Sequence, residues 1–504
     1  MLSAGTTCKN TRDAGWNVTV ARPEGAAARL APVLGRFAST PFLWMRIAVG
    51  AAIALIVALW AARPWVAGDT PFVWDGTNAF VDCLSNGDFV ACRHHDELDY
   101  WGLTSPIGDW PLLQHVPDLV AMAFGAQAHH TRELVFVALS IAGLAGSVAL
   151  AYLVLTKTGQ RAWFWGFIVV LLSGPLIAYG RTTAGEALAA GLLVCLIAAT
   201  AVRAPPPALA LAVLAASLTK ETSYPFVAAL GVLGLVLARK RTGRPIRRDL
   251  VWGGVGLATG IVLASLFNVV RFGSPLNTNY LQPELHTAGL VQPLDYSLAL
   301  FASPNGGMLV YWPAASALLA VTCVLPFLRS GRKVPLGPSL VLIAVIVGLT
   351  LGFASWWDAF GGGYGARFTL PWVLPLVLLG LVAYGDSLGT LTARLLAPVW
   401  RLLLVFAVLF VFALPHVGHI WKPEATAKFF DAHGCQAPWR AGFDEFHSCQ
   451  HRRMWYGKPM PLYSLDGVAS VGGVVTSIAL GVALLGALVL LRAEAGPAPS
   501  QRTS

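Results

Sequence analysis

The chain has 504 residues, of which 56% are hydrophobic and only 12% are charged, and its mean hydropathy is +0.64. A soluble domain carries roughly 25% charged residues, so this composition excludes a soluble enzyme. The 24 Phe, 18 Trp and 11 Tyr exclude a fibrous or largely disordered chain, because these side chains need apolar surroundings. The formal net charge of +10 fits the basic residues that orient membrane proteins and does not indicate a nucleic-acid partner.

Twelve apolar runs are candidates for crossing a bilayer, for which a helix needs about 20 mostly apolar residues. The fifth run is short, and the fourth contains the carboxylate Glu186. We therefore expect an all-α membrane protein with about twelve transmembrane helices. The runs lie near residues 44–63, 133–156, 162–180, 184–202, 206–219, 223–238, 251–270, 307–328, 337–354, 367–385, 399–418 and 468–491.

These runs divide the chain into parts of different character. A polar N-terminal segment that we expect to be flexible precedes a transmembrane catalytic module, and an outer loop, one last helix and a short tail follow. The parts are residues 1–43, 44–420, 421–467, 468–491 and 492–504.

Basic residues in the short connections predict the orientation, because Lys and Arg accumulate on the cytoplasmic side. If residues 1–43 are cytoplasmic, every cytoplasmic connection is basic, and the largest cluster lies at 239–248. An error of one span would place half of these clusters outside. We expect a multi-pass protein of the inner or plasma membrane with both termini in the cytoplasm.

The long loops then all fall on the outer side, at 64–132, 271–306 and 421–467. The first of them is rich in Trp and Tyr and is divided by Pro and Gly. This pattern predicts amphipathic helices that lie along the membrane surface.

Four of the seven cysteines lie in outer loops. Cys83 and Cys92 share the first loop, and Cys435 and Cys449 share the last one. In an oxidising compartment this arrangement is compatible with two disulfides, each within one loop. The last loop has no paired Cys-x-x-Cys, so we predict no metal site there.

The first outer loop contains a candidate general base. Asp75 follows the first run by about ten residues and lies among aromatic side chains, which lower the local dielectric constant. A carboxylate in this position can accept a proton from an attacking hydroxyl group. Seven further acidic residues follow in the loop, so a solvated aspartate without a catalytic role is the alternative.

Basic residues at the outer membrane edge form a second group, made of Arg181, Lys220, Arg271 and Arg367. Basic residues are usually depleted on this side. A phosphate at the membrane surface would be a natural partner, because Arg binds phosphate bidentately and Lys acts as a point charge. For each residue alone, anchoring of a helix at the interface is the alternative.

Two glycine-bearing segments complete the outer side, Ser303-Pro-Asn-Gly-Gly307 and the longer stretch 356–368. The second contains Trp357, Asp358 and Tyr364 between its glycines. Glycine allows close backbone approach, and aromatic rings offer stacking faces to a sugar. We expect these three side chains to line a site.

As a set, these features resemble the GT-C superfamily of polytopic glycosyltransferases, above all its bacterial protein O-mannosyltransferase and aminoarabinose-transferase-like branch. The chain has an acid early in the first outer loop, a Glu that begins the fourth run and a Thr-Lys that ends the fifth. Ser-Pro-x-x-Gly precedes the eighth run, and Trp-Trp-x-x-x-Gly-Gly-x-x-Gly-x-Arg precedes the tenth. The resemblance spans roughly 44–420 and is most specific over 355–372.

The resemblance implies transfer of a sugar from a polyprenyl-phosphate carrier to an acceptor on the extracytoplasmic face, with inversion at the anomeric carbon. The acceptor would be an envelope glycan, a lipid or a protein, attacked through a hydroxyl or amine. Asp75 would be the base, Lys220 and Arg367 would bind the donor phosphate, and Glu186 would line the site.

The reaction that the resemblance implies needs no cofactor. Cations that stabilise the departing phosphate leave no chemical need for a divalent metal. One departure concerns the base, because many family members carry an Asp-Glu pair where this chain has Asp75 and Gly76.

Three other functions are compatible with the sequence. An oligosaccharide ligase or polymerase with a lipid-pyrophosphate donor would use the His and Arg residues of 421–467. A twelve-helix transporter would usually show internal repeats, which we do not find. A scaffold protein would leave the outward-facing Lys220 and Arg367 unexplained.

Overall fold

The computed structural model describes the central part of the chain. The expected spans at 44–63, 399–418 and 468–491 lie outside the described residues, except for residue 486. The described residues are 70–87, 107–108, 110–125, 129–180, 185–220, 223–278, 281, 286–287, 289–304, 307–328, 335–356, 369–395, 451, 454–455 and 486.

All regular secondary structure in this part of the chain is helical, apart from one isolated bridge between His286 and Trp356. The expected all-α class is thereby confirmed. Four helices contain stretches long and apolar enough to cross a membrane: α5 (His129–Lys157), α11 (Arg247–Phe272), α15 (Leu336–Ala354) and α16 (Leu370–Leu395). Other helices run beside them: η1 (Arg161–Trp163), α6 (Phe164–Leu172), α8 (Glu186–Ala201), α9 (Pro206–Ser217), α10 (Tyr224–Thr242) and α14 (Pro313–Leu328).

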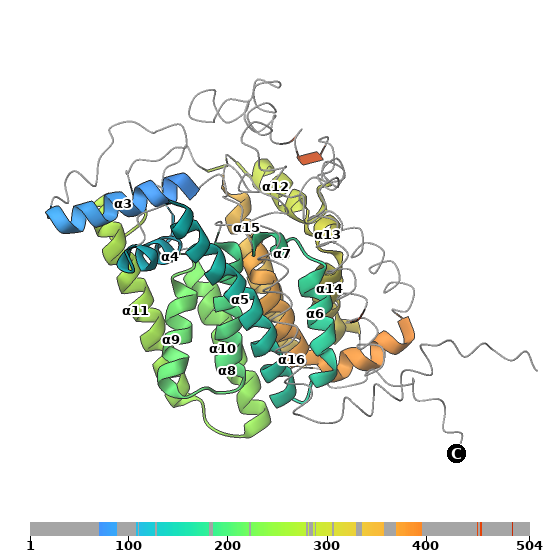
Figure 1. The fold of residues 1–504 in the computed structure, drawn as a ribbon. Helices are drawn as coiled ribbons and strands as arrows, with labels where there is room; N and C mark the ends of the chain where they lie inside the picture. Colours follow the sequence, from blue (N-terminus) through green and yellow to red (C-terminus); the bar gives the residue numbers. More distant parts are fainter. Residues whose placement is uncertain are drawn as a thin grey trace, which may run out of the picture.

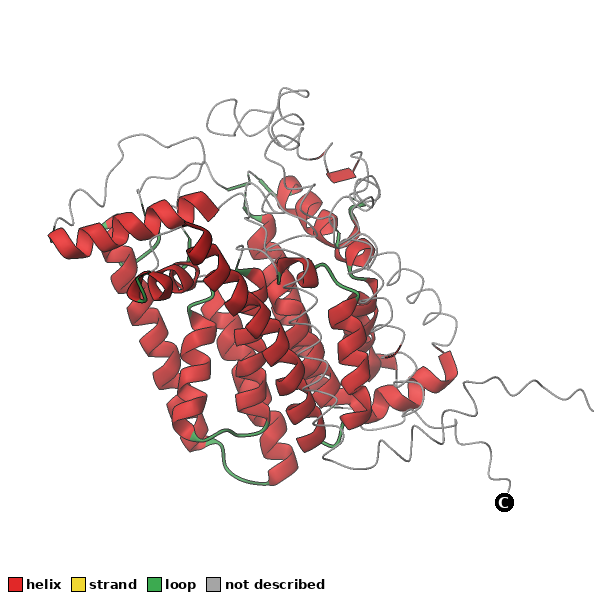
Figure 2. Cartoon of the chain, viewed as in Figure 1, coloured by secondary structure: helices red, strands yellow, loops and turns green. Residues whose placement is uncertain are grey.

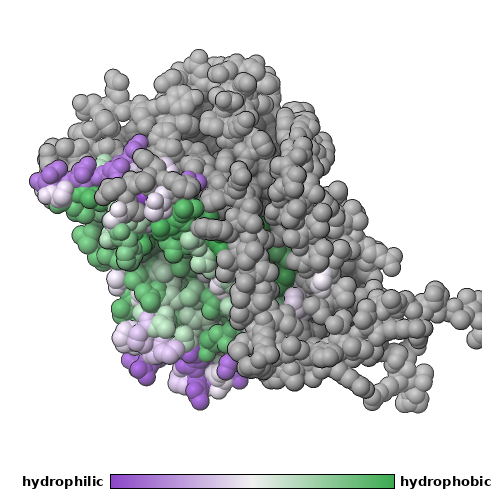
Figure 3. Space-filling view, in the orientation of Figure 1, coloured by the Kyte–Doolittle hydropathy of each residue, from purple (hydrophilic) through white to green (hydrophobic). Residues whose placement is uncertain are grey.

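A belt of apolar side chains crosses the middle of the coloured part of the visible face, with hydrophilic side chains above and below it (Figure 3). Helix α11 contributes much of this belt through exposed side chains such as Val251, Val255, Val262 and Leu266. Soluble monomers rarely expose continuous apolar surface of this size. The belt and the long apolar helices are those of a multi-pass membrane protein.

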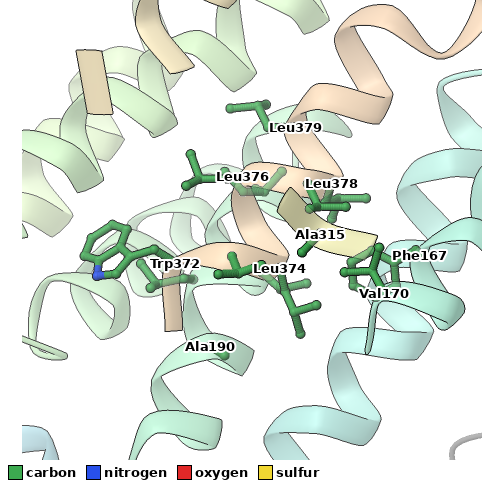
Figure 4. Close-up of a cluster of buried hydrophobic side chains, with 14 of the residues drawn as sticks. Phe167, Val170, Ala190, Ala315, Trp372, Leu374, Leu376, Leu378 and Leu379 are labelled. Atoms are coloured by element: carbon green, nitrogen blue, oxygen red, sulfur yellow. The ribbon is translucent and has the colours of Figure 1, made fainter. Parts of the chain in front are cut away.

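The core lies between α6, α8, α14 and α16. Their buried side chains meet in one cluster, which includes Phe167, Ala190, Ala315, Trp372 and Leu374 (Figure 4). Helix α8 is buried nearly all round, which explains its short and almost wholly apolar sequence.

Glycines bring pairs of helices into close contact. A Cβ added at Gly191 of α8 would lie 2.6 Å from the Cα of Gly143 on α5. A Cβ at Gly256 of α11 would lie 2.2 Å from the carbonyl oxygen of Ala210 on α9. Small residues allow such backbone approach in membranes, where van der Waals packing and hydrogen bonds hold helices together.

Two expected spans are interrupted in the structure. The run 162–180 breaks at Gly174 and Pro175, and the run 307–328 breaks at Trp312. Proline lacks a backbone donor, and the Trp312 ring fills the space beside Gly174, where a Cβ would lie 2.0 Å from it. Trp312 Nε1 also donates a 2.7 Å hydrogen bond to the Val170 carbonyl, so the two breaks fit together. The short helices beside them are α7 (Leu176–Tyr179) and α13 (Met308–Tyr311).

Helices also form outside the spans, at one end of the bundle. Helix α3 lies across the ends of the long helices, and α4 lies close to it (Figures 1 and 2). Both belong to the first outer loop, where amphipathic helices were expected. These peripheral helices are α3 (Thr70–Asn86), α4 (Leu112–Ala123) and α12 (Val291–Ala302).

Candidate functional site

The end of the bundle that carries α3 gathers several predicted site residues. We call it the outer end, after the side of the membrane on which the sequence predicts it to lie. Glu186 begins α8, Lys220 follows α9, Arg271 lies in the last turn of α11, and Phe353 lies in the last turn of α15. The ends of these helices meet on the same side of the bundle in Figure 1. Residues that are far apart in the sequence therefore lie at one end of the bundle, where Glu186 and Arg271 are buried.

Helix α3 presents Asp75 on its exposed face. Val73, Trp74, Gly76 and Thr77 are buried around it, whereas Asp75 is exposed. A Cβ at Gly76 would lie 2.3 Å from the carbonyl oxygen of Ile107, so the helix rests on this loop at a point that only glycine fits. The Asp75 carboxylate is thus accessible to a substrate.

Polar side chains hold α3 against the neighbouring helices. Thr77 Oγ1 lies 3.0 Å from His115 Nδ1 on α4, and Asn78 Oδ1 accepts a 3.0 Å hydrogen bond from Arg132 on α5. Arg132 forms a buried bidentate ion pair with Asp118 of α4. Such a pair must be fully hydrogen-bonded to offset the cost of desolvation. These contacts join α3, the helix that carries Asp75, to α4 and α5.

His115 is a buried, neutral histidine at physiological pH. Its burial, and secondly the nearby charge of Arg271, lower its pKa to about 3. Its ring packs against Phe267 of α11, with the ring centroids 5.3 Å apart. The side chain therefore belongs to the support of α3 and not to an accessible site.

Arg271 is completely buried, with 0% of its surface exposed. Its guanidinium donates to Asn268 Oδ1 at 2.7 and 2.9 Å and to the carbonyls of Gly108 and Trp110 at 3.2 and 2.6 Å. The sequence predicted donor-phosphate binding for Arg271, but these internal acceptors occupy its donors. We therefore leave Arg271 out of the donor site, and its observed role is to hold the first outer loop on α11.

Glu186 lies buried in the first turn of α8, after Gly185 with φ +81°. A carboxylate in this position interacts favourably with the positive end of the helix dipole. Gln114 of α4 packs beside Gly185, where a Cβ would lie 3.3 Å from its side chain. Glu186 is thus placed at the outer end, next to the helix that supports α3.

Lys220 is half-buried at the end of α9. Its Nζ lies 5.0 Å from the centroid of the Phe353 ring, within the range of a cation–π interaction. The contact directs the ammonium group toward the last turn of α15, which comes just before the glycine-bearing segment 356–368.

The loop after α11 is joined to the start of that segment. Thr287 N donates a 2.9 Å hydrogen bond to the Ser355 carbonyl, and the rings of His286 and Trp356 meet edge to face at 5.8 Å. The remaining predicted residues lie outside the described part of the chain: Arg181, Trp357, Asp358, Tyr364, Arg367, Cys92, Cys435 and Cys449.

Cys83 lies on α3 and is disulfide-bonded. Because Cys92 lies outside the described residues, the pairing of Cys83 with Cys92 stays a prediction, as does the second disulfide. Over the ranges that the structure describes, no cluster of three or more His, Cys, Asp and Glu side chains could hold a metal ion.

Sequence reasoning missed a group of polar contacts at the outer end. Asp295 of α12 accepts a 2.9 Å hydrogen bond from Trp455 Nε1, and its other oxygen lies 2.8 Å from His451 Nδ1. Nearby, Ser303 Oγ donates a 2.6 Å hydrogen bond to the Met454 carbonyl. Part of the last outer loop therefore lies against α12. No local signal predicts a contact between residues about 155 positions apart.

The fold and the outer end define an all-helical, multi-pass membrane protein. No family model matches the chain, and no curated protein matches it. Among solved structures, the chain is similar to the crystal structure of ArnT from Cupriavidus metallidurans bound to undecaprenyl phosphate. The sequences are 17% identical, the match covers 89% of this chain and 78% of that chain, and the TM-score is 0.41. A likeness at this level assigns no activity and no functional residue.

Proposed function

We propose that the protein is a membrane glycosyltransferase that moves a sugar from a polyprenyl-phosphate donor to an acceptor hydroxyl or amine on the extracytoplasmic face. The observation that carries the proposal is the presence of the exposed Asp75 carboxylate and the Lys220 ammonium at one end of the bundle. In transfer from a phosphate-linked donor, a base activates the acceptor and a cation stabilises the departing phosphate.

Asp75 would accept the proton of the acceptor hydroxyl as the oxygen attacks the anomeric carbon. The new glycosidic bond forms on the side opposite the phosphate, and the bond between the anomeric carbon and the phosphate oxygen breaks. The electron pair leaves with the phosphate, so the configuration inverts. One base is sufficient for this single displacement, unlike hydrolysis by a pair of carboxylates.

Lys220 and Arg367 would stabilise the charge that the phosphate gains. The Phe353 ring beside the Lys220 ammonium supports this role, because an apolar neighbour excludes water and strengthens a cation's interaction with phosphate. The order of the motifs around these residues, which resembles the GT-C superfamily, supports the same assignment.

The test is transfer from a synthetic polyprenyl-phosphate sugar by the full-length protein in liposomes, with Asp75→Asn compared with Asp82→Asn. Asp82 is also exposed and lies seven residues further along α3, which makes it a matched control. We expect Asp75→Asn to lower kcat by about 10²- to 10⁴-fold, the usual contribution of a general base. Asp82→Asn should retain wild-type turnover. Full activity of Asp75→Asn, or an equal loss in both variants, would refute the assignment.

The contacts of the last outer loop favour a second candidate, an oligosaccharide ligase or polymerase with a lipid-pyrophosphate donor. Asp295 and Ser303 hold residues of that loop at the outer end. The two candidates differ in their donor, so the same liposomes supplied with a lipid-pyrophosphate oligosaccharide distinguish them. Product formed from the pyrophosphate alone would favour the ligase.

A further inference from the structure

The end of the bundle opposite Asp75 carries a dense group of cations where α10 passes into α11. We call this group the cationic turn. All of its members are exposed, and the hydrophilic surface at this end is visible below the apolar belt in Figure 3. The cationic turn consists of Arg239, Lys240, Arg244, Arg247 and Arg248.

A further arginine, which lies outside the turn, holds the backbone of the turn in place. Arg203, between α8 and α9, donates to the carbonyls of Arg244 and Pro245 at 3.3 and 2.8 Å. It also forms an ion pair with Asp249 at 2.6 Å. Among the described residues, Arg203 is the one non-glycine residue with positive φ, at 56°. The backbone that carries these cations is therefore held in place by contacts with a distant segment of the chain.

The cationic turn has no acidic residue available to neutralise it locally. Asp249 is the single acid between residues 239 and 249, and Arg203 already binds it. No ion pair within the described residues involves a member of the turn. Arg247 and Arg248 also lie in the first turn of α11, where the helix dipole disfavours cations. Arg239 and Lys240 lie in the last turn of α10, where the dipole favours cations, but no described acid neutralises the turn. Its charge is therefore left for a negatively charged partner.

The lipid-facing surface begins next to the turn. Leu250, Val251 and Trp252 of α11 are exposed, two to four residues after Arg248. At a rise of about 1.5 Å per residue, these side chains lie within about 6 Å of the Arg248 backbone along the helix axis. Tryptophan is enriched at the level of the lipid head groups. The cations therefore lie where the phosphates of a bilayer would lie.

We propose that the cationic turn binds the head groups of anionic phospholipids in the adjacent leaflet, which is the cytoplasmic one by the distribution of basic residues. The ligand class is a phosphate diester anchored by its acyl chains beside Leu250, Val251 and Trp252. The arginines bind the phosphates, and the apolar side chains contact the chains. This inference is independent of the proposed glycosyl transfer.

The test is native mass spectrometry of the full-length protein, released from nanodiscs that contain equal amounts of phosphatidylglycerol and phosphatidylcholine. We expect the wild type to retain phosphatidylglycerol preferentially. Arg244→Gln, Arg247→Gln and Arg248→Gln combined should lose this preference, with affinity falling about fivefold for each cation removed. The charge-conserving triple change to Lys should keep most of it. The control for the single variant Arg247→Gln is Lys157→Gln, because Lys157 is an exposed cation at the end of α5 and lies outside the turn. The control should change the lipid preference less than Arg247→Gln does.

Equal retention of the two lipids by the wild type, or undiminished preference in the triple Gln variant, would overturn the proposal. Larger loss in Lys157→Gln than in Arg247→Gln would also overturn it. Thermal stabilisation in detergent separates the sources of phosphate, because phosphatidylglycerol should raise the unfolding temperature and inorganic phosphate should not. An equal rise with both would assign the turn to a soluble anion. If the triple Gln variant does not fold, the single variants and the Lys variant decide.

Discussion

Arg271 donates a 2.6 Å hydrogen bond to the backbone carbonyl of Trp110, which lies 161 residues earlier in the chain. This bond joins the end of a membrane-spanning helix to the loop on which α3 rests, and α3 carries Asp75. The cation that was expected to bind the donor thus supports the helix of the candidate base.

The first prediction concerns this tether. Arg271→Met should destabilise the protein, because buried carbonyls left without donors cost about 1–3 kcal/mol each. Arg271→Lys should be intermediate, since an ammonium cannot reproduce the planar donor set. Unfolding temperature in detergent, followed by Trp fluorescence, measures the effect. Lys157→Met, at an exposed position, is the control and should unfold like the wild type. Unchanged stability of Arg271→Met would contradict a structural role.

The second prediction concerns pH. Burial lowers the pKa of His115 to about 3 from an ordinary value of 6.5, so the unfolded state binds more protons between these values. Stability should therefore be at its full value above about pH 6.5 and fall as the pH drops toward 3. His115→Gln, which cannot titrate, should lose less stability over this interval. Unfolding temperature measured at steps of pH checks this, and parallel profiles for the two proteins would count against it.

The third prediction concerns the contact of α5 and α8. Gly191→Ala places a Cβ within 3 Å of the Gly143 backbone, so the helices must separate, at a cost of about 1–3 kcal/mol. Gly146→Ala is the matched control, because a Cβ there meets nothing within 4 Å. Alanine favours a helix over glycine by about 1 kcal/mol, so this control should be neutral or stabilising. Equal effects of the two substitutions on the unfolding temperature would show that the close approach is unimportant.

The fourth prediction concerns Lys220 and rests on the proposed function. Lys220→Met should lower kcat/KM for a polyprenyl-phosphate sugar by about 100-fold, as expected when one stabilising charge is removed. Lys220→Arg should retain part of the activity, because it keeps the charge. Phe353→Leu should have a smaller effect than Lys220→Met, since it removes the ring and not the cation. Initial rates in liposomes provide the measurement, and wild-type kcat/KM in Lys220→Met would exclude a role in donor binding.

Sequence predicted the positions of most described spans well. The run at 251–270 became α11, Arg247–Phe272, and the run at 337–354 became α15, Leu336–Ala354. The sequence predicted one continuous helix at 162–180 and one at 307–328, but both are interrupted. The Trp312 ring at one break packs against Gly174 at the other. The prolines beside these breaks were visible in the sequence, but the interlocking of the breaks depends on residues about 140 positions apart.

Prediction of the candidate site was limited for the same reason. The sequence placed Asp75 among aromatic side chains that lower the dielectric constant, whereas the structure exposes its side chain to the surroundings. That Lys220 faces outward stays a prediction, and the burial of Arg271 did not follow from the topology. Its acceptors at Gly108 and Trp110 are far away in the chain, and no spacing rule brings them together. The contact of Asp295 with His451 and Trp455 was equally invisible.

The sequence by itself determined that this is a helical protein of the membrane. An apolar run that crosses the hydrocarbon must satisfy its own backbone hydrogen bonds, and a helix does so with contacts inside the run. Only the tertiary structure decided which charged side chains remain available to a substrate and which are used inside the protein. The reason is that a cation's role depends on its nearest acceptors, and for Arg271 and Arg203 those acceptors come from distant segments that folding alone brings into contact.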